Sequence, residues 1–192
     1  MKPMTRIWLR MRRRALKLLG DKRGVAAVEF AVIVPVMLVL FFGVEEFSSG
    51  VAVDRKVTLM ARTLSDLTSQ NTSVTDTQLT NFFNASSAIM TPYPSAPVKS
   101  TITELYVDPA TLQARVQWSK GASPKPPGTT VPIPTALQVG DTYLIYSEVA
   151  YKFIPTIGYV MAKAGINLTD FTFTRPRQSL CVLYGTTVCT KT

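Results

Sequence analysis

The most hydrophobic stretch of the chain is a run of 20 residues, 25–44, in which Glu29 is the only charged side chain. At about 1.5 Å of rise per residue, a helix of this length spans the roughly 30 Å hydrocarbon core of a bilayer. The run therefore predicts a transmembrane helix over residues 25–44. Pro35 removes one backbone hydrogen bond from the middle of this helix and is expected to kink it, which membrane helices tolerate.

A helical pattern continues past this run, over residues 45–69, but here it is amphipathic. Small or apolar residues recur at spacings of three and four, with charged residues between them: Gly50, Val53, Val57, Met60, Leu64 and Leu67. The pattern predicts one helix from about residue 25 to residue 68, with a weak point at Ser48-Ser49-Gly50. Because the stripe lasts too few heptads for a coiled coil, we expect it to pack on the domain that follows.

Residues 70–192 have the pattern of a small domain that mixes helix and strand. Thr75 and Gln78 have the spacing of a capping box, which predicts a second helix that ends before Pro92. Three prolines within residues 92–97 predict an extended linker. Alternating polar and apolar positions then predict strands at residues 101–107, 114–118, 142–153 and 171–177, with a short helix at 156–164 and a terminal hairpin at 181–189.

The segment 119–141 is the longest part of this domain without a clear period. It contains five prolines and three glycines and predicts an exposed loop. Loops of this length are uncommon in compact domains and often serve recognition. We therefore regard 119–141 as a candidate recognition loop.

The net charge of +9 is concentrated before the apolar run. Residues 1–24 contain nine Lys or Arg and one Asp, a net charge of +8, which leaves +1 for residues 25–192. Basic residues beside a membrane helix stay on the cytoplasmic side, so the pattern predicts that 70–192 is exported. A nearly neutral domain is not expected to bind nucleic acid. The predicted fold class is α+β, a long N-terminal transmembrane helix extending into a small exported domain with an antiparallel β-sheet.

The residue types present leave little room for catalysis. The chain has no histidine, which excludes a Ser-His or Cys-His couple and an ordinary zinc site. The glycines form no phosphate-binding motif. Cys181 and Cys189 are the only cysteines, and in an oxidising compartment they are expected to form a short-loop disulfide; a reversed topology would leave them as free thiols. We expect no enzymatic activity, no metal and no cofactor.

The junction between the basic leader and the apolar run carries the most specific motif. A secretory signal peptide is cut after its apolar region at a small-x-small sequence, and Gly43-Val44-Glu45-Glu46 matches this poorly. Gly24, in contrast, is a small residue at the start of the run. A cut after Gly24 would make Val25 the first residue and Glu29 the fifth.

Residues 24–47 resemble the prepilins of the tight-adherence (Tad, or Flp) type IV pilus system, and in particular the TadE-like pseudopilins. Members of that family have a basic leader, a glycine, a few small residues and a Glu-Phe or Glu-Tyr pair. A membrane helix with an internal proline and a Gly-x-x-Glu-Phe-like exit follow. The residues that carry the resemblance here are Gly24, Val25-Ala26-Ala27-Val28, Glu29-Phe30, Pro35 and Gly43-Val44-Glu45-Glu46-Phe47.

The resemblance implies a processing step, a location and a set of partners. A prepilin peptidase would recognise Gly24, Glu29 and Phe30 and remove residues 1–24 by cutting between Gly24 and Val25. Other pseudopilins, the major pilin of the Tad system, an inner-membrane assembly platform and the lipid bilayer would be the partners. The chain would cross the bacterial inner membrane once, with its N-terminus cytoplasmic and its C-terminal domain periplasmic, and could enter a surface pilus.

Glu29 needs a partner because a carboxylate inside a membrane is costly, by a few kcal/mol. After the cut, the new α-amino group of one subunit would be a cation in apolar surroundings. The Glu29 carboxylate of a neighbouring helix could pair with it and fix the axial register, which buried pairs do more reliably than they add stability. The alternative is that Glu29 lies at the polar edge of the bilayer beside Lys22 and Arg23.

Three functions remain open from the sequence. The first is a minor pseudopilin, processed by a prepilin peptidase, that takes part in Tad pilus assembly through helix packing. The second is an uncleaved membrane-anchored periplasmic binding module whose loop 119–141 and sheet recognise a ligand. The third is a pilus-tip adhesin, which shares the cut but places its function in the same distal loop.

Overall fold

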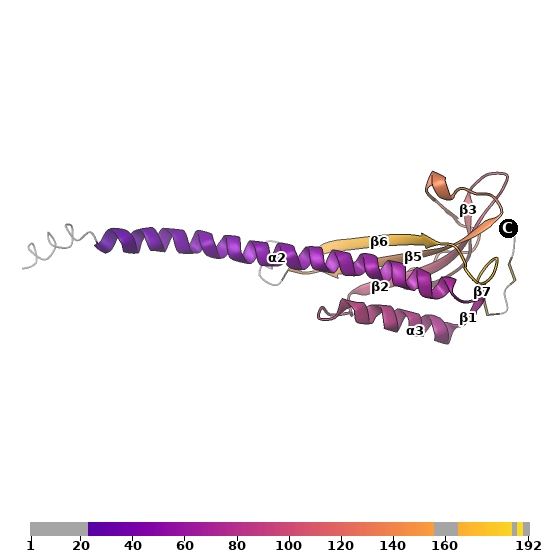
Figure 1. The fold of residues 1–192 in the computed structure, drawn as a ribbon, viewed down its shortest axis with the longest axis horizontal. Helices are drawn as coiled ribbons and strands as arrows, with labels where there is room; N and C mark the ends of the chain where they lie inside the picture. Colours follow the sequence, from indigo (N-terminus) through magenta and orange to yellow (C-terminus); the bar gives the residue numbers. More distant parts are fainter. Residues whose placement is uncertain (1–22, 156–164, 186–187, 190–192) are drawn as a thin grey trace, which may run out of the picture. The chain divides into compact units, whose positions relative to one another are not determined.

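The computed structural model describes residues 23–155, 165–185 and 188–189 (Figure 1). The basic leader, apart from Arg23 and Gly24, and the predicted helix at 156–164 lie outside the described residues. Contacts divide the chain into two units, Met1–Phe47 and Ser48–Thr192. The predicted α+β class is confirmed, with a long apolar helix followed by a domain built on an antiparallel sheet.

The first element, α2, is a single helix from Arg23 to Ser69. Its bounds agree with the predicted helix, and it continues through Pro35 and through Ser48-Ser49-Gly50, so the expected weak point does not break it. Up to Phe47 almost every residue is exposed. From Ser48 onward one face of α2 is buried in the C-terminal unit.

The buried face of α2 is the predicted amphipathic stripe. Val53, Val57, Met60 and Leu64 have no exposed surface, and Leu67 is half-buried. Burial of an apolar side chain of this size is worth about 1.5–3 kcal/mol, so this stripe is a major source of the domain's stability. The prediction that the stripe packs on its own domain is confirmed.

A short strand and a second helix follow α2. After β1 (Ser73–Val74), α3 extends from Asp76 to Ser87 and passes into the 3-10 helix η1 (Ala88–Met90). Thr75 caps α3, its side chain accepting from the Gln78 backbone N–H while the Gln78 side chain accepts from the Thr75 backbone N–H, as the capping box predicts. Residues 91–97 form turns, in which Tyr93 N–H donates to the Met90 carbonyl at 2.7 Å, so the predicted extended linker is wrong.

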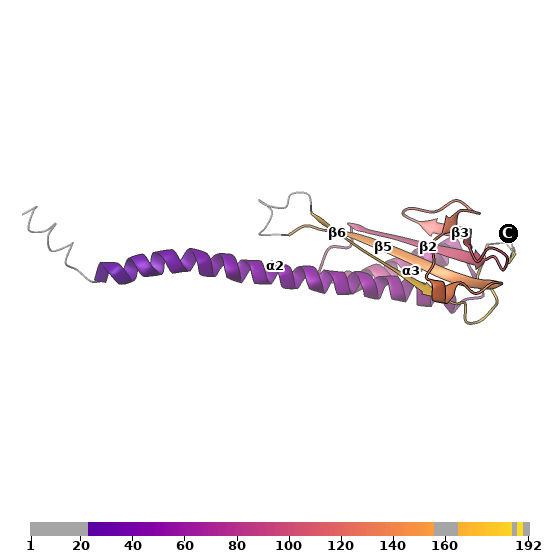
Figure 2. The same ribbon diagram turned by 90° about the horizontal axis from the view of Figure 1, so that it is seen from above.

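Five strands form the main sheet in the order β4-β3-β2-β5-β6, with antiparallel neighbours throughout (Figures 1 and 2). Their bounds are β2 Val98–Val107, β3 Ala114–Gly121, β4 Thr130–Val131, β5 Thr142–Phe153 and β6 Ile166–Thr174. The predicted strand 142–153 agrees with β5 at both ends. The strand predicted at 171–177 both begins and ends earlier in the structure. β6 begins at Ile166, which pairs with Phe153 of β5, and it ends at Thr174, directly before Arg175-Pro176.

The two faces of this sheet carry separate cores. Successive strand residues point to opposite faces. We call the face beneath α2 and α3 the helix face, where Ile102, Ile145 and Val149 join the apolar stripe of α2. We call the other the outer face, where Leu105, Leu144 and Val131 form a smaller cluster.

The predicted loop 119–141 is only partly a loop. Its first residues belong to β3, residues 130–131 form β4, and residues 135–137 form the 3-10 helix η2 (Thr135–Leu137). Val131 is buried and Ile133 and Leu137 pack beside it, so the segment covers the outer face instead of projecting from it. The hydrophobic pattern of residues 119–141 did not predict this packing, because prolines separate the apolar residues of the segment.

The C-terminal segment returns to the helix face. Its strand β7 (Leu183–Tyr184) pairs in parallel with β1, which the predicted terminal hairpin did not include; residues 186–187 of that hairpin lie outside the described residues. Cys181 and Cys189 are joined in a disulfide with their Cα atoms 6.0 Å apart.

Candidate functional site

The residues of the predicted processing motif all lie in the first two turns of α2. Gly24 and Val25 follow directly on Arg23, where the helix begins, and Glu29 and Phe30 lie one turn further on. All four are exposed, with 58 % of Val25 and 69 % of Phe30 accessible. The motif is thus presented on a regular helix, with no described part of the chain covering it.

Gly24 has no structural role that would exclude a side chain. A Cβ atom built at this position meets nothing within 4 Å, and the same is true of Gly43. Glycine inside a helix is less stable than alanine by roughly 0.5–1 kcal/mol. Any requirement for glycine at position 24 must therefore come from another molecule that approaches the helix.

Val25 and Glu29 are four residues apart in α2. Side chains at this spacing are neighbours on one helix face, with Cβ atoms about 5–6 Å apart. Among the described residues, Glu29 forms no ion pair. The structure therefore places the side chains of Val25 and Glu29 side by side on one face of α2.

The apolar run provides a large surface without an internal partner. Large side chains point outward all round the helix, including Ile33, Leu40 and Phe41, each at least 56 % accessible. None of its most apolar window is buried within the chain. By length and composition this helix is able to cross a membrane, and an N-terminal apolar helix of this kind indicates membrane anchoring.

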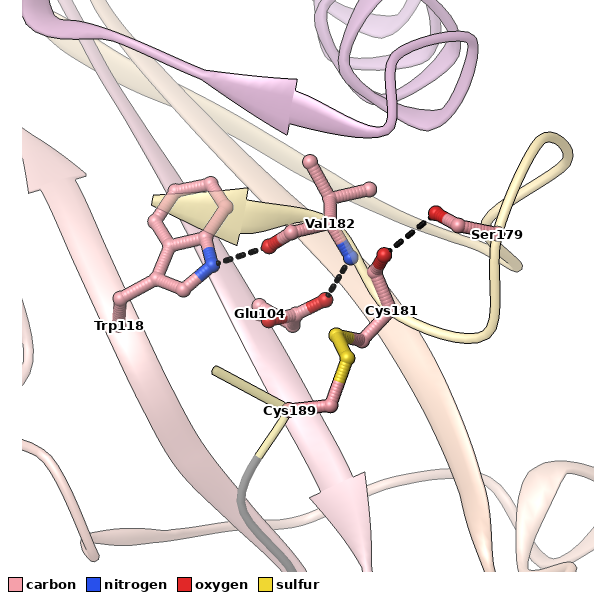
Figure 3. Close-up of a disulfide and its surroundings, with 6 residues drawn as sticks. All are labelled: Glu104, Trp118, Ser179, Cys181, Val182 and Cys189. Carbon is pink, nitrogen blue, oxygen red and sulfur yellow. Dashed lines mark hydrogen bonds between the residues drawn. A yellow bond between two sulfur atoms is a disulfide. The ribbon is translucent and has the colours of Figure 1, made fainter. Parts of the chain in front are cut away.

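A second polar site lies inside the domain, beside the disulfide (Figure 3). Glu104 of β2 is only 3 % exposed and points to the helix face, where its Oε1 accepts a hydrogen bond of 2.5 Å from the Val182 backbone N–H. Trp118 Nε1 donates to the Val182 carbonyl at 2.8 Å. Together these bonds hold both polar groups of the Val182 backbone and fix the segment that carries Cys181.

Burial raises the pKa of Glu104 to about 7, against the lowering effect of the hydrogen bonds from Val182 and Trp118. A buried carboxylate with this arrangement fixes a chain segment. Sequence reasoning missed Glu104. The signal was present, because position 104 shares a strand face with Ile102 and Tyr106 and is the only charged residue there.

No further chemical site emerges from the described residues. Within 23–155, 165–185 and 188–189, no group of three or more His, Cys, Asp or Glu side chains lies close enough to hold a metal ion. The structure joins the two cysteines that were predicted to form a disulfide. They belong to the unit Ser48–Thr192, whereas the predicted processing motif lies in the unit Met1–Phe47.

The comparisons with known proteins agree with the motif. Residues 24–64 match the family of TadE-like proteins, a match that lies wholly within α2 and covers about a fifth of the chain. No curated protein and no solved structure matches the chain. The predicted resemblance to TadE-like proteins is confirmed for this segment, and the match suggests a protein related to the Tad pilus.

Proposed function

With residues 24–64 established as a TadE-like segment, we propose that this protein is a minor pseudopilin of a Tad-type pilus. It is made with a basic leader, cut after Gly24 by a prepilin peptidase, and assembled through the apolar half of α2. One observation carries the proposal. The motif Gly24 to Phe30 lies on an exposed helix whose apolar surface has no partner among the residues that the structure describes.

The processing step is hydrolysis of the peptide bond between Gly24 and Val25. Water adds across the bond, leaving a carboxylate on Gly24 and an ammonium group on Val25. The open space around the Gly24 Cα allows a peptidase to approach the backbone closely. The cut also separates a leader with eight net positive charges from the membrane helix, because residues 1–24 carry nearly all of the basic excess.

Glu29 then matches the charge of the new N-terminus. The ammonium group of a processed subunit and the Glu29 carboxylate of a neighbour form an ion pair in apolar surroundings, which fixes the axial register of the two helices. The same carboxylate lies one turn from its own Val25 and is also able to hold that amine until assembly. In both arrangements Glu29 acts by positioning, with no chemistry of its own.

The location and partners follow from this assignment. The chain lies in the bacterial inner membrane with the unit Ser48–Thr192 on the periplasmic side. Its partners are the peptidase, the other pseudopilins, the major pilin and the assembly platform. The binding-module and adhesin alternatives rested on an exposed loop at 119–141, and that support is weakened because Val131, Ile133 and Leu137 pack on the outer face.

The cut is tested by intact mass and N-terminal sequencing of the protein from native membranes. We expect the wild-type chain to begin at Val25 and a Gly24→Val variant to keep its leader. Gly43→Val is the matched control, because its Cβ also meets nothing within 4 Å, and it should be processed normally. A wild-type chain that still carries residues 1–24 in cells with an active peptidase would exclude the proposal.

The role of Glu29 is tested by Glu29→Gln, with Glu45→Gln as a control on the same helix. Because Glu29 belongs to the motif that the peptidase would recognise, the comparison uses only chains that N-terminal sequencing shows to begin at Val25. Among these, we expect Glu29→Gln to fold but to lose, by at least tenfold, its co-purification with other pilus subunits from detergent extracts. Glu45→Gln should co-purify as the wild type does. Normal co-purification of Glu29→Gln would remove the register role and leave the cut unaffected.

A further inference from the structure

The two edges of the main sheet differ in how well they are protected. At one edge, β4 is two residues long and is flanked by prolines on both sides. At the other edge, β6 is nine residues long and pairs with β5 from Ile166 to Thr174 without a register shift. Among the described residues, no strand pairs with the outer side of β6 (Figures 1 and 2).

β6 also lacks most of the features that usually prevent edge-to-edge pairing. Natural edge strands are short, contain proline, lysine or an inward-pointing charge, or bear a bulge. β6 has no proline, lysine or bulge, none of its residues is buried, and its one charged residue is Asp170, which pairs with Val149 and so lies on the helix face. The Phe171 N–H donates to the Asp170 carboxylate at 2.8 Å; the other outward N–H and C=O groups of β6 have no strand partner among the described residues and are open to another extended chain.

The outer face beside β6 contains an apolar pocket of about 270 Å³. Phe171, Phe173 and Tyr146 line it, with ring centroids 4.8 Å apart for Tyr146 and Phe173, and Phe171 remains 56 % exposed. Lys125 and Glu148 close one end, and their 2.5 Å ion pair leaves the pocket without net charge. This surface fits an aliphatic or aromatic side chain.

On the helix face, a second hollow of about 380 Å³ lies beside the same part of β6. Thr172 and Thr174 line it together with Arg62, Asp66 and Arg177. Asp66 and Arg177 form an ion pair. Among the described residues Arg62 has no ion pair, so this hollow carries a net positive charge and favours an acidic side chain.

We propose that β6 is a docking edge that takes an extended segment of another protein as an additional strand of the sheet. Backbone hydrogen bonds supply the affinity in this mode of recognition, and pockets for alternate side chains supply the specificity. Because neighbouring residues of an added strand point to opposite faces, the segment has apolar and acidic residues at adjacent positions. The inference is independent of the cut after Gly24 and goes beyond the role of the apolar helix.

A second copy of the chain is a poorer occupant. Gly50 lies near Phe153 and Ser65 bonds Thr174, so within the C-terminal unit α2 points in the same direction as β6. A second β6 added in antiparallel orientation would bring its own α2 in reversed, which two chains anchored in one membrane do not allow. A second copy is therefore restricted to parallel addition, whereas an extended segment of a different protein is not; a dimer is an outcome that the test below distinguishes.

The test uses the full chain in detergent micelles and two labelled peptides, (Glu-Val)4 and (Lys-Val)4, with binding followed by fluorescence anisotropy. We expect (Glu-Val)4 to bind at least tenfold more tightly than (Lys-Val)4 and to slow backbone hydrogen exchange in β6 at least tenfold. Equal binding of the two peptides, or unchanged exchange in β6, would overturn the proposal.

Variants at the two pockets sharpen this test. Phe171→Lys and Arg62→Glu should each weaken (Glu-Val)4 binding at least tenfold. Leu59→Lys is the matched control, because Leu59 is exposed to a similar extent, 52 %, but lies on α2, outside β6 and both pockets, and it should bind as the wild type does. Loss of binding in Leu59→Lys alone, or a micellar dimer that only Phe171→Lys disrupts, would contradict the assigned occupant.

Discussion

The two halves of α2 belong to one helix but have opposite surroundings. Met37, in the half that ends at Phe47, is 61 % exposed, whereas Met60, in the half that begins at Ser48, has no exposed surface. The first half is apolar all round, and the second has an apolar stripe between charged residues. The pattern around a helix thus indicates where its partner lies: an apolar stripe packs on its own domain, and a fully apolar surface requires lipid or other chains.

The difference also separates stability from assembly. Residues 48–69 contribute to the core of the domain, so changes there should alter its unfolding. Residues 23–47 have exposed side chains throughout most of their length, so changes there should alter membrane insertion and subunit contacts instead. Matched variants in the two halves make this separation measurable.

The largest effect is expected from truncation of the buried methionine. Met60→Ala removes a fully buried side chain and should lower the free energy of unfolding of the domain by about 2–5 kcal/mol. Met37→Ala makes the same chemical change at an exposed position and should leave the free energy of unfolding within about 0.5 kcal/mol of the wild-type value. Denaturant unfolding of the full chain in detergent, followed by the fluorescence of Trp118 in a Trp8→Phe background, measures both; equal losses would show that the halves are not independent.

An intermediate effect is expected from the buried carboxylate. The pKa of Glu104 is raised from 4.5 to about 7, so between these pH values the folded protein keeps a proton that the unfolded chain releases. Stability should therefore fall as the pH rises through this range, by about 3 kcal/mol in total. Glu104→Gln keeps the oxygen that accepts from Val182 and should remove this slope, making the variant the more stable protein above pH 7.

Glu29→Gln is the matched control for this pH dependence, because it changes the same functional group in the other unit of the chain, Met1–Phe47. Its domain should unfold with the wild-type pH profile. The measurement is the unfolding free energy at several values between pH 4.5 and pH 8. A flat wild-type profile would show that Glu104 does not keep its proton, and a Glu29→Gln profile without the slope would contradict the separation of the two units.

The smallest of the three effects concerns the disulfide. Replacing both Cys181 and Cys189 by serine opens a loop with a sequence separation of 8 and should lower the free energy of unfolding by about 2 kcal/mol. Reductant should have the same effect on the wild-type protein and none on the double variant. The helix content of α2 in micelles, measured by circular dichroism, should not change. A large loss would show that the C-terminal disulfide also supports the helix.

Local pattern was sufficient wherever neighbouring residues alone determine the structure. The continuous helix, the capping box at Thr75 and Gln78, and strand β5 were all predicted with nearly correct bounds. The motif that predicts processing is also visible in the sequence, because its glycine, glutamate and phenylalanine are close together in the chain and need no tertiary contact; the processing itself stays a prediction. Its recognition as TadE-like rests on the same short-range order.

Other features depend on residues far apart in the chain, and no local pattern records them. The outer-face role of 119–141 depends on Val131 meeting Leu105 and Leu144, and the parallel pairing of β7 depends on β1, over a hundred residues earlier. Likewise, Ser147 donates to the Ala61 carbonyl at 2.5 Å, a bond that ties β5 to α2. These contacts are decided by which elements the sheet order brings together.

The sequence by itself therefore determined the long apolar helix, its TadE-like segment and most of the elements. Periodicity and spacing are properties of consecutive residues, so they can be read without a fold. Only the tertiary structure decided that Glu104 is buried against Val182 and that β6 is an open edge between an apolar and a cationic pocket. Burial, pKa and an unpaired edge are properties of neighbours in space, and they exist only once the chain has folded.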